Sequence, residues 1–316
     1  MSYSRDEILT VAFYNVENLF DTINDPNTND DVYTLKGERN WNYKRYYSKL
    51  KKIGYVISQI GKKRSSEPPV LVGLAEVENA RVLNDLVNQK DLQKFGYRYV
   101  HFDSNDERGI DTALLYRDRF FDPVSTDTMQ FNFLDENGNF DYTRDVLLVS
   151  GFMNDDLVHI LVNHWPSRRE GELVSRSKRI KAADVVMEAV DRIRSKDPDA
   201  KIIIMGDFND NPTSESISNH LVTKDFFNPM LSIYESGLGT LTFRKEWHLF
   251  DQIILSNNFN SDNRSHQFIS AEIFNKSWLT TRKGKHKGAP FRTYIGPWYR
   301  GGFSDHFPVF VTLKKN

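Results

Sequence analysis

Apolar runs alternate along the chain with segments in which apolar residues recur at helical spacing. Strand-like runs occupy Ile8 to Asn15 and the stretches PPVLVGLAEVE and KIIIMGDFN. Runs that are apolar at every position are typical of strands buried on both faces. A longer helix is expected from about Glu172 to Arg194, and Asn79 is placed to cap a short helix. An amphipathic helix is predicted where these residues recur: Tyr43, Tyr47, Leu50, Ile53, Ile57 and Ile60.

Four further strand-like runs follow one another in the middle of the chain: YRYVHFD, TALLYR, RDVLLVSGFM and LVHILVNHW. Because they are consecutive, we expect them to be antiparallel neighbours. FDQIILS and FPVFVTL are the last clear strands. Strands mixed with crossover helices predict an α/β fold in which two packed mixed β-sheets are flanked by helices, in a single domain over residues 1–316.

Composition narrows the class of protein only in part. With 39% hydrophobic and 27% charged residues, the chain has the composition of a globular protein. The formal net charge of -1 excludes the global basic field of a dedicated non-specific nucleic-acid binder. The absence of cysteine excludes disulfides, thiolate metal sites and a cysteine nucleophile. No run has the length of a membrane span and no signal peptide is visible, so the compartment stays open.

Acids, amides and histidines gather where the apolar runs end, which is where ligands collect in layered α/β proteins. Each residue alone has an ordinary role as a turn, cap or packed side chain. Asp210 and Asn211, for example, are interpreted as turn residues that lead into Pro212. The polar residues at these ends are Asn15, Glu17, Glu76, Glu78, His164, Asp207, Asn209, Asp251, Asp305 and His306.

Taken together, these side chains predict a metal-dependent phosphoesterase. Buried carboxylates are costly unless they are paired or bound to a metal. Carboxylates, amides and histidines without cysteine suit Mg²⁺ or Mn²⁺. Zinc is less favoured because no closely spaced histidine pair is present. At such a site the metal neutralises developing charge, an aspartate prepares water, and a protonated histidine stabilises the phosphorane oxygens.

The same motifs resemble those of the endonuclease/exonuclease/phosphatase superfamily, which includes pancreatic deoxyribonuclease, apurinic endonucleases, neutral sphingomyelinases and inositol polyphosphate phosphatases. The matching segments occur in the family's order and span almost the whole chain: FYNVEN, GLAEVEN, RGIDTALLYR, VNHWPSR, MGDFNDNP, FDQIILS and FSDHFPV. The resemblance implies a four-layer α/β sandwich. It also implies direct in-line attack of water on phosphorus, with no covalent enzyme intermediate.

The resemblance further implies roles for individual residues. Glu76 resembles the principal metal-binding glutamate, with Asn15 assisting at the metal and phosphate and Asp305 lying near the metal. Asp207 resembles the acid that positions or activates the attacking water. Asn209 resembles the amide that holds the phosphate and steadies that acid.

Two histidines complete the implied site. His306 resembles the histidine that contacts the scissile phosphate, oriented by Asp251. His164 resembles a second histidine that protonates the leaving oxygen or binds phosphate. Asp111, in RGIDTALLYR, is a candidate for orienting His164. We expect an active enzyme because no core group is lost at the positions that depart from the family's pattern: Glu17, Ala75 and Gln252.

The substrate is the least determined part of the prediction. The basic segment Arg282 to Gly296 leads towards Asp305, and its aromatic residues could stack bases while its cations follow a nucleic-acid backbone. A solvated loop explains the same charges. The candidate substrate-binding residues are Arg168, Arg292 and Tyr294.

Our first hypothesis is a monomeric phosphodiesterase that acts on a nucleic acid or nucleotide. A phosphomonoesterase or a sphingomyelinase-like lipid phosphodiesterase on the same site remains open. So does a catalytically silent binding module.

Overall fold

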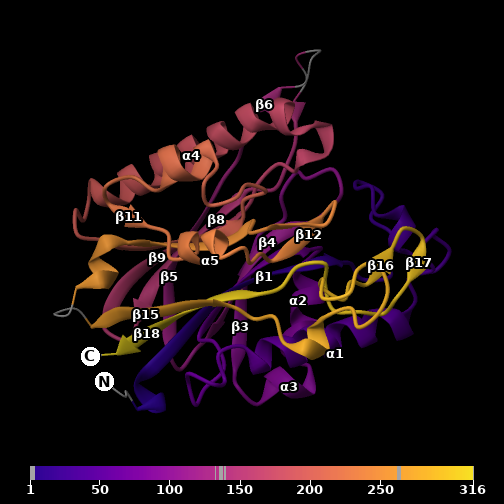
Figure 1. Cartoon of the computed structure of the whole chain (residues 1–316), viewed down its shortest axis with the longest axis horizontal. Helices are drawn as coiled ribbons and strands as arrows, with labels where there is room; N and C mark the ends of the chain where they lie inside the picture. The colour runs from indigo at the N-terminus through magenta and orange to yellow at the C-terminus, as the bar shows by residue number, and fades with distance from the viewer. Residues whose placement is uncertain (1–3, 132, 135–137, 139, 262–264, 316) are drawn as a thin grey trace.

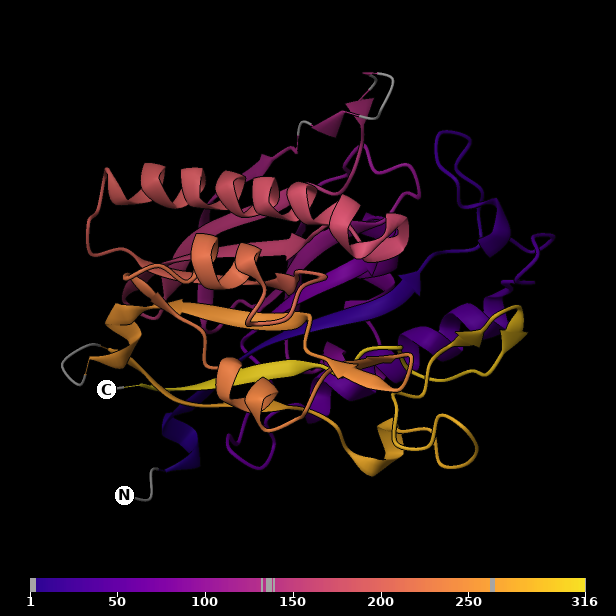
Figure 2. The same cartoon turned by 45° about the horizontal axis from the view of Figure 1, so that its top comes forward.

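The computed structural model describes residues 4–131, 133–134, 138, 140–261 and 265–315. Two six-stranded sheets pack face to face and form the middle of the molecule (Figure 1). Apolar side chains from both sheets meet between them, including Val11 and Phe13 from one sheet and Ile203 and Met205 from the other. Helices cover the two outer faces (Figure 2). The predicted four-layer α/β sandwich is therefore confirmed.

The first sheet runs β15 (His266–Ile273), β18 (Val309–Lys315), β1 (Ile8–Leu19), β2 (Leu71–Val77), β4 (Asp111–Arg117), β3 (Tyr97–His101). The second runs β11 (Phe226–Phe227), β14 (Asp251–Ser256), β10 (Lys201–Asp207), β9 (Asp156–His164), β8 (Val146–Met153), β5 (Phe121–Met129). Both sheets are mixed because β1 is parallel to β2 and β9 is parallel to β10, whereas the other pairs are antiparallel.

The helices include α1 (Tyr43–Gln59), α2 (Ala80–Val87), α3 (Lys90–Gln93), α4 (Glu172–Arg194) and α5 (Leu231–Glu235). Short 3-10 segments span Arg5–Glu7, Asp31–Tyr33, Arg168–Glu170, Asn257–Asn260 and Ser277–Leu279, and a π-helical turn spans Ser216–Leu221. Three small hairpins are β6 (Phe133–Leu134) with β7 (Phe140–Asp141), β12 (Leu241–Phe243) with β13 (Glu246–His248), and β16 (Tyr294–Ile295) with β17 (Trp298–Tyr299).

The expected helices form where the periodicity places them. Apolar residues of α1 and α2 pack on the first sheet, and those of α4 pack on the second. Asn42 caps α1 by accepting a hydrogen bond from the backbone N–H of Arg45. Asn79 caps α2 in the same way from Val82, as predicted. No helix in the described part of the chain is long and apolar enough to cross a membrane.

One topological expectation is wrong. The four consecutive strand runs do not form one antiparallel series, because β3 pairs with β4 in the first sheet whereas β8 pairs with β9 in the second. Between β4 and β8 the chain crosses to the other sheet through β5. That edge strand is exposed along most of its length, so its sequence, FDPVSTDTM, carries little apolar signal.

Candidate active site

The predicted residues converge where strands from both sheets end. Asp207, the last residue of β10, is paired in register with His164 of β9 and with Asp251 of β14. The first sheet contributes Asn15, whose side-chain Nδ2 donates a 3.0 Å hydrogen bond across the sandwich to Oδ2 of Asp207. Sheet register and sheet packing therefore fix the position of this carboxylate before any substrate binds.

The surroundings of Asp207 raise the pKa of its carboxyl group. Its side chain is buried, and burial together with the charge of Asp251 raises its pKa to about 6, against the lowering effects of His306 and two hydrogen bonds. The backbone N–H of Asn209 donates to its Oδ1 at 3.0 Å. This bond and the one from Asn15 hold the carboxylate in one orientation.

His306 is held in its cationic form. Burial alone would lower its pKa, but the carboxylates of Asp251, Asp207 and Asp305 outweigh burial and raise the pKa well above its ordinary value. Its Nδ1 lies 2.7 Å from Oδ2 of Asp251, and the hydroxyl of Thr240 donates to the same oxygen. Its Nε2 lies 3.9 Å from Oδ2 of Asp207. A cationic imidazole therefore stands beside the candidate base.

His164 has the opposite character. Burial, helped by the charges of Arg144 and Arg108, lowers its pKa well below the ordinary value, so this imidazole is neutral. Its Nε2 lies 3.9 Å from both Oε1 of Glu76 and Oδ2 of Asp207. Its buried Nδ1 has no hydrogen-bond partner among the described residues.

Asp111 does not orient His164 as expected. Its carboxylate lies 3.2 Å from Nε2 of His101 and accepts a hydrogen bond from the backbone N–H of Ser104. The register between β3 and β4 explains this contact. His101 pairs with Ala113, two residues after Asp111, so the loop that follows β3 passes over Asp111. His101, Asp103 and Asp111 form a separate group of potential metal ligands.

Glu76 is presented by a strained backbone. It has φ of +65°, and Glu17 and Asn18 on the neighbouring strand also have positive φ, at a break in the β1–β2 register. Such strain in non-glycine residues is typical of functional sites. The N–H of Asn18 donates 2.8 Å to Oε2 of Glu76. This hydrogen bond leaves Oε1 directed towards His164.

The carboxylates and amides of the site are ligand types that a hard divalent cation prefers. Asp305, beside His306 in the sequence, is held at 2.6 Å by Nη2 of Arg292. Asp207, Asp251 and His306 also lie close enough to hold a cation. However, a protonated imidazole has no lone pair for a metal, so the cationic form of His306 is not a metal ligand.

Glu17, which the sequence places among the strand-end residues without a role, lies beside the site. It is buried, and its carboxylate accepts hydrogen bonds from the backbone N–H groups of Thr293 and Tyr294. Lys49, which is also buried, lies 3.8 Å away. Glu17 thus ties β1 to the segment that carries Arg292, a long-range contact that sequence spacing alone does not show.

Two of the three predicted substrate-binding residues have other roles. Tyr294 is buried, and its hydroxyl donates to the carbonyl of Arg39, so its ring cannot stack a base. It packs against Tyr33 and Trp41 instead. The guanidinium nitrogens of Arg168 contact Asn209, Asp210 and Glu172 within the protein.

Arg292 is the exception among the three. It lies at the edge of the site, half-exposed, and it contacts Asp305 and Glu17. A cavity of about 640 Å³ lies elsewhere, beside the loop that follows β1. Among the residues that line it, Glu78 has a pKa raised to about 8 by burial and by neighbouring aspartates. Such an acidic lining disfavours a phosphate anion.

Comparison with known proteins assigns the chain to a family that is consistent with the geometry of the site. A profile of the Endonuclease/Exonuclease/phosphatase family matches residues 10–315, so the chain belongs to that family. It is therefore a metal-dependent hydrolase of phosphate ester bonds. A search of curated proteins finds no match.

Solved structures share the fold at low sequence identity. Truncated Caenorhabditis elegans TDP2 is 18% identical with a TM-score of 0.61, covering 97% of this chain and 98% of that one. A D. rerio TDP2 structure, described as complexed with single strand DNA product, is 14% identical with a TM-score of 0.60, covering 98% and 100%. A family protein from Bacteroides thetaiotaomicron is 18% identical with a TM-score of 0.58, covering 98% of each chain.

Proposed function

We propose that the protein is a phosphodiesterase that cleaves a nucleic acid or nucleotide by in-line attack of water on phosphorus. The observation that carries this proposal is the pairing of a buried carboxylate, Asp207, with a cationic imidazole, His306, whose Nε2 lies 3.9 Å away. A base and a cation side by side suit a reaction in which water loses a proton while phosphoryl oxygens gain charge.

A divalent cation, Mg²⁺ or Mn²⁺, would be held by Glu76, Asn15 and Asp305 and would neutralise the charge that develops on the phosphate. Asp207, with its pKa at about 6, is ionised at neutral pH and would accept the proton of the attacking water.

The remaining groups would hold the phosphate. One N–H of the Asn209 amide is donated to the carbonyl of Trp165 at 2.9 Å, and the other would bind a phosphate oxygen. His306 would stabilise the charged oxygens. The neutral imidazole of His164 would offer one N–H to the phosphate or to the leaving oxygen.

A nucleic-acid substrate is favoured by the surface near Arg292. The residues from Arg282 to Lys287 are exposed and include four cations. On the adjoining hairpin, Trp298 is 74% exposed, which suits stacking of an unpaired base. Of the similar structures, the D. rerio TDP2 structure is described as holding single strand DNA product. These features favour a diester in a single-stranded nucleic acid.

The first experiment compares hydrolysis of a chromogenic phosphate diester, the matching monoester and a single-stranded DNA oligonucleotide, with Mg²⁺, with Mn²⁺ and with chelator. The Asp207→Asn variant should lose roughly 10²–10⁴-fold in kcat, the usual contribution of a general base. Asp191→Asn, on the exposed face of α4, is the matched control.

Metal-dependent cleavage of the diester and the oligonucleotide, lost in Asp207→Asn only, is the expected result. Preference for the monoester would replace the proposal with a phosphatase. Full turnover in Asp207→Asn would remove Asp207 from the role of base.

A further inference from the structure

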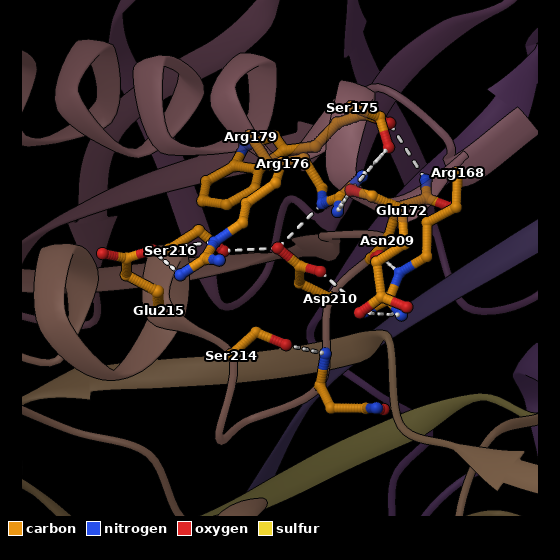
Figure 3. A network of polar contacts seen from close by, with 12 residues as sticks. Arg168, Glu172, Ser175, Arg176, Arg179, Asn209, Asp210, Ser214, Glu215 and Ser216 are labelled. Atoms are coloured by element: carbon orange, nitrogen blue, oxygen red, sulfur yellow. Dashed lines mark hydrogen bonds and ion pairs between the residues drawn. The ribbon is translucent and has the colours of Figure 1, made fainter. Parts of the chain in front are cut away.

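A buried network of charges lies behind the turn that follows β10 (Figure 3). Asp210 is at its centre and is 3% exposed. Its Oδ1 accepts a 2.7 Å hydrogen bond from Nη2 of Arg168, and its Oδ2 lies 2.7 Å from Nε of Arg179. Ser216 donates its hydroxyl to Oδ2 at 2.6 Å. We name Asp210, Arg168 and Arg179 the Asp210 clamp.

The clamp is anchored to rigid elements on both sides. Arg179 lies on α4, is 1% exposed, and donates through Nη1 to the hydroxyl of Ser175 one turn earlier. The backbone carbonyl of Asp210 accepts a 2.7 Å hydrogen bond from Nε2 of Gln252 on β14. Buried charges are stable only when they are paired. Movement of Asp210 out of this position would therefore cost free energy, because it would leave buried charges unpaired.

The clamp acts directly on Asn209. Nε of Arg168 donates 2.8 Å to the backbone carbonyl of Asn209, so one guanidinium binds both this carbonyl and the carboxylate of Asp210. Asn209 has φ of +50°, a left-handed conformation that persists only when surrounding contacts impose it. In that conformation its N–H donates to Oδ1 of Asp207. Its side-chain amide donates to the carbonyl of Trp165.

We propose that Asp210 is a positioning residue for the reaction: through Arg168 it holds Asn209 in its left-handed conformation, and Asn209 in turn holds the carboxylate of Asp207. The proposal rests on the proposed function, because it assigns the clamp to the same reaction. It also gives Arg168 a role different from the substrate contact expected from sequence.

The contacts of the Arg168 guanidinium group support this different role. Its third nitrogen, Nη1, lies 3.1 Å from the carboxylate of Glu172, and the guanidinium stacks 4.8 Å above the ring of Phe250. Each guanidinium nitrogen therefore has a protein partner, and these contacts fix the orientation of the side chain. A positioning role affects kcat, whereas a substrate contact affects KM.

The test measures kcat and KM on the chromogenic diester for Asp210→Asn and for Arg168→Gln. Both should lower kcat between about 10-fold and 100-fold, because small misplacements of catalytic groups have effects of this size. KM should stay within about twofold of wild type. Arg168→Gln is the second variant should Asp210→Asn fail to fold, since the Arg168 side chain is 20% exposed. Glu215→Gln, which breaks the neighbouring exposed pair with Arg176, is the control and should change neither constant.

A double-mutant cycle separates positioning from general destabilisation. In an Asn209→Gly background, Asp210→Asn should reduce kcat by no more than about twofold further, because glycine adopts the left-handed conformation without help from the clamp. A full additional loss would overturn the proposal. So would unchanged kcat in both single variants, or a rise in KM alone for Arg168→Gln.

Hydrogen exchange of the peptide that covers residues 205–212 tests the clamp without any substrate. Exchange should be faster in Asp210→Asn and Arg168→Gln than in wild type, because the Asn209 N–H is no longer held. Absence of hydrolysis by wild type would refute the proposed function. The exchange result would still show whether the Asp210 clamp holds Asn209. Unchanged protection in both variants would overturn the proposed role of the Asp210 clamp.

Discussion

Replacing Asp251 by asparagine tests the electrostatic design of the site most directly. The substitution keeps the size of the side chain and removes the negative charge that faces Nδ1 of His306 at 2.7 Å. Asp251 is fully buried, so water cannot take over its role. The variant therefore removes one charge-assisted hydrogen bond, and it also removes a charge that helps to raise the pKa of Asp207.

The size of the effect follows from that hydrogen bond. A hydrogen bond to a charged group contributes about 1.5–3 kcal/mol. If the bond stabilises the cationic His306 in the transition state, its loss lowers kcat by roughly 10-fold to 100-fold. Removal of Thr240's hydroxyl by Thr240→Val affects a neutral hydrogen bond to the same oxygen of Asp251. That control should cost about 1 kcal/mol, or roughly fivefold in kcat.

The pH dependence has a definite sign. Because His306 has a raised pKa and its protonated form is the active one, activity is present below that pKa and is lost as pH rises through it. Asp251→Asn lowers this pKa, so the alkaline limb of the kcat–pH profile should move to lower pH. The assay is steady-state hydrolysis of the chromogenic diester across pH, with thermal unfolding as a check of folding. Wild-type kcat together with an unmoved alkaline limb would refute the reasoning.

Three further predictions concern the metal, the base and the stability of the fold. Chelation should abolish diester hydrolysis, and added Mg²⁺ or Mn²⁺ should restore it; turnover that survives dialysis against chelator would argue against the cation site near Glu76. Because burial raises the pKa of Asp207 to about 6, kcat should fall as pH drops through that value, and a flat profile down to about pH 5 would contradict its role as base. Asp156 is hydrogen-bonded by Lys201, Ser265 and His266, which against the effect of burial lower its pKa to about 2. Its stabilisation is thus present above the unfolded pKa of about 3.9 and is lost as pH falls through the folded value. Asp156→Asn should therefore lower the free energy of unfolding by about 2 kcal/mol at neutral pH, measured by urea titration, whereas Asp155→Asn at the exposed neighbour should leave it unchanged.

Local sequence was sufficient to predict the buried strands and the polar residues at their ends. The apolar run IIIM is typical of a strand buried on both faces, and β10 lies in the middle of the second sheet. Because such strands meet at a common edge, Asp207, His164 and Asp251 could be predicted to lie together. Edge strand β5 could not be predicted, since its mostly exposed residues carry no apolar pattern.

Tertiary structure decided which partner each polar side chain has. Asp111 binds His101 rather than His164 because of the β3–β4 register, which a one-residue shift would change. Tyr294 is buried because Glu17 holds the backbone of its segment against β1, a contact between residues far apart in sequence.

The sequence by itself therefore determined the family, the layered architecture and the residue types of the site, because these depend on local patterns and short motifs. Only the tertiary structure showed that Asp210, interpreted as a turn residue, is the centre of a buried charge network with Arg168 and Arg179. The physical reason is that the pairing of buried charges depends on which distant elements pack together. No local pattern around Asp210 records that α4 brings Arg179 to within 2.7 Å of its carboxylate.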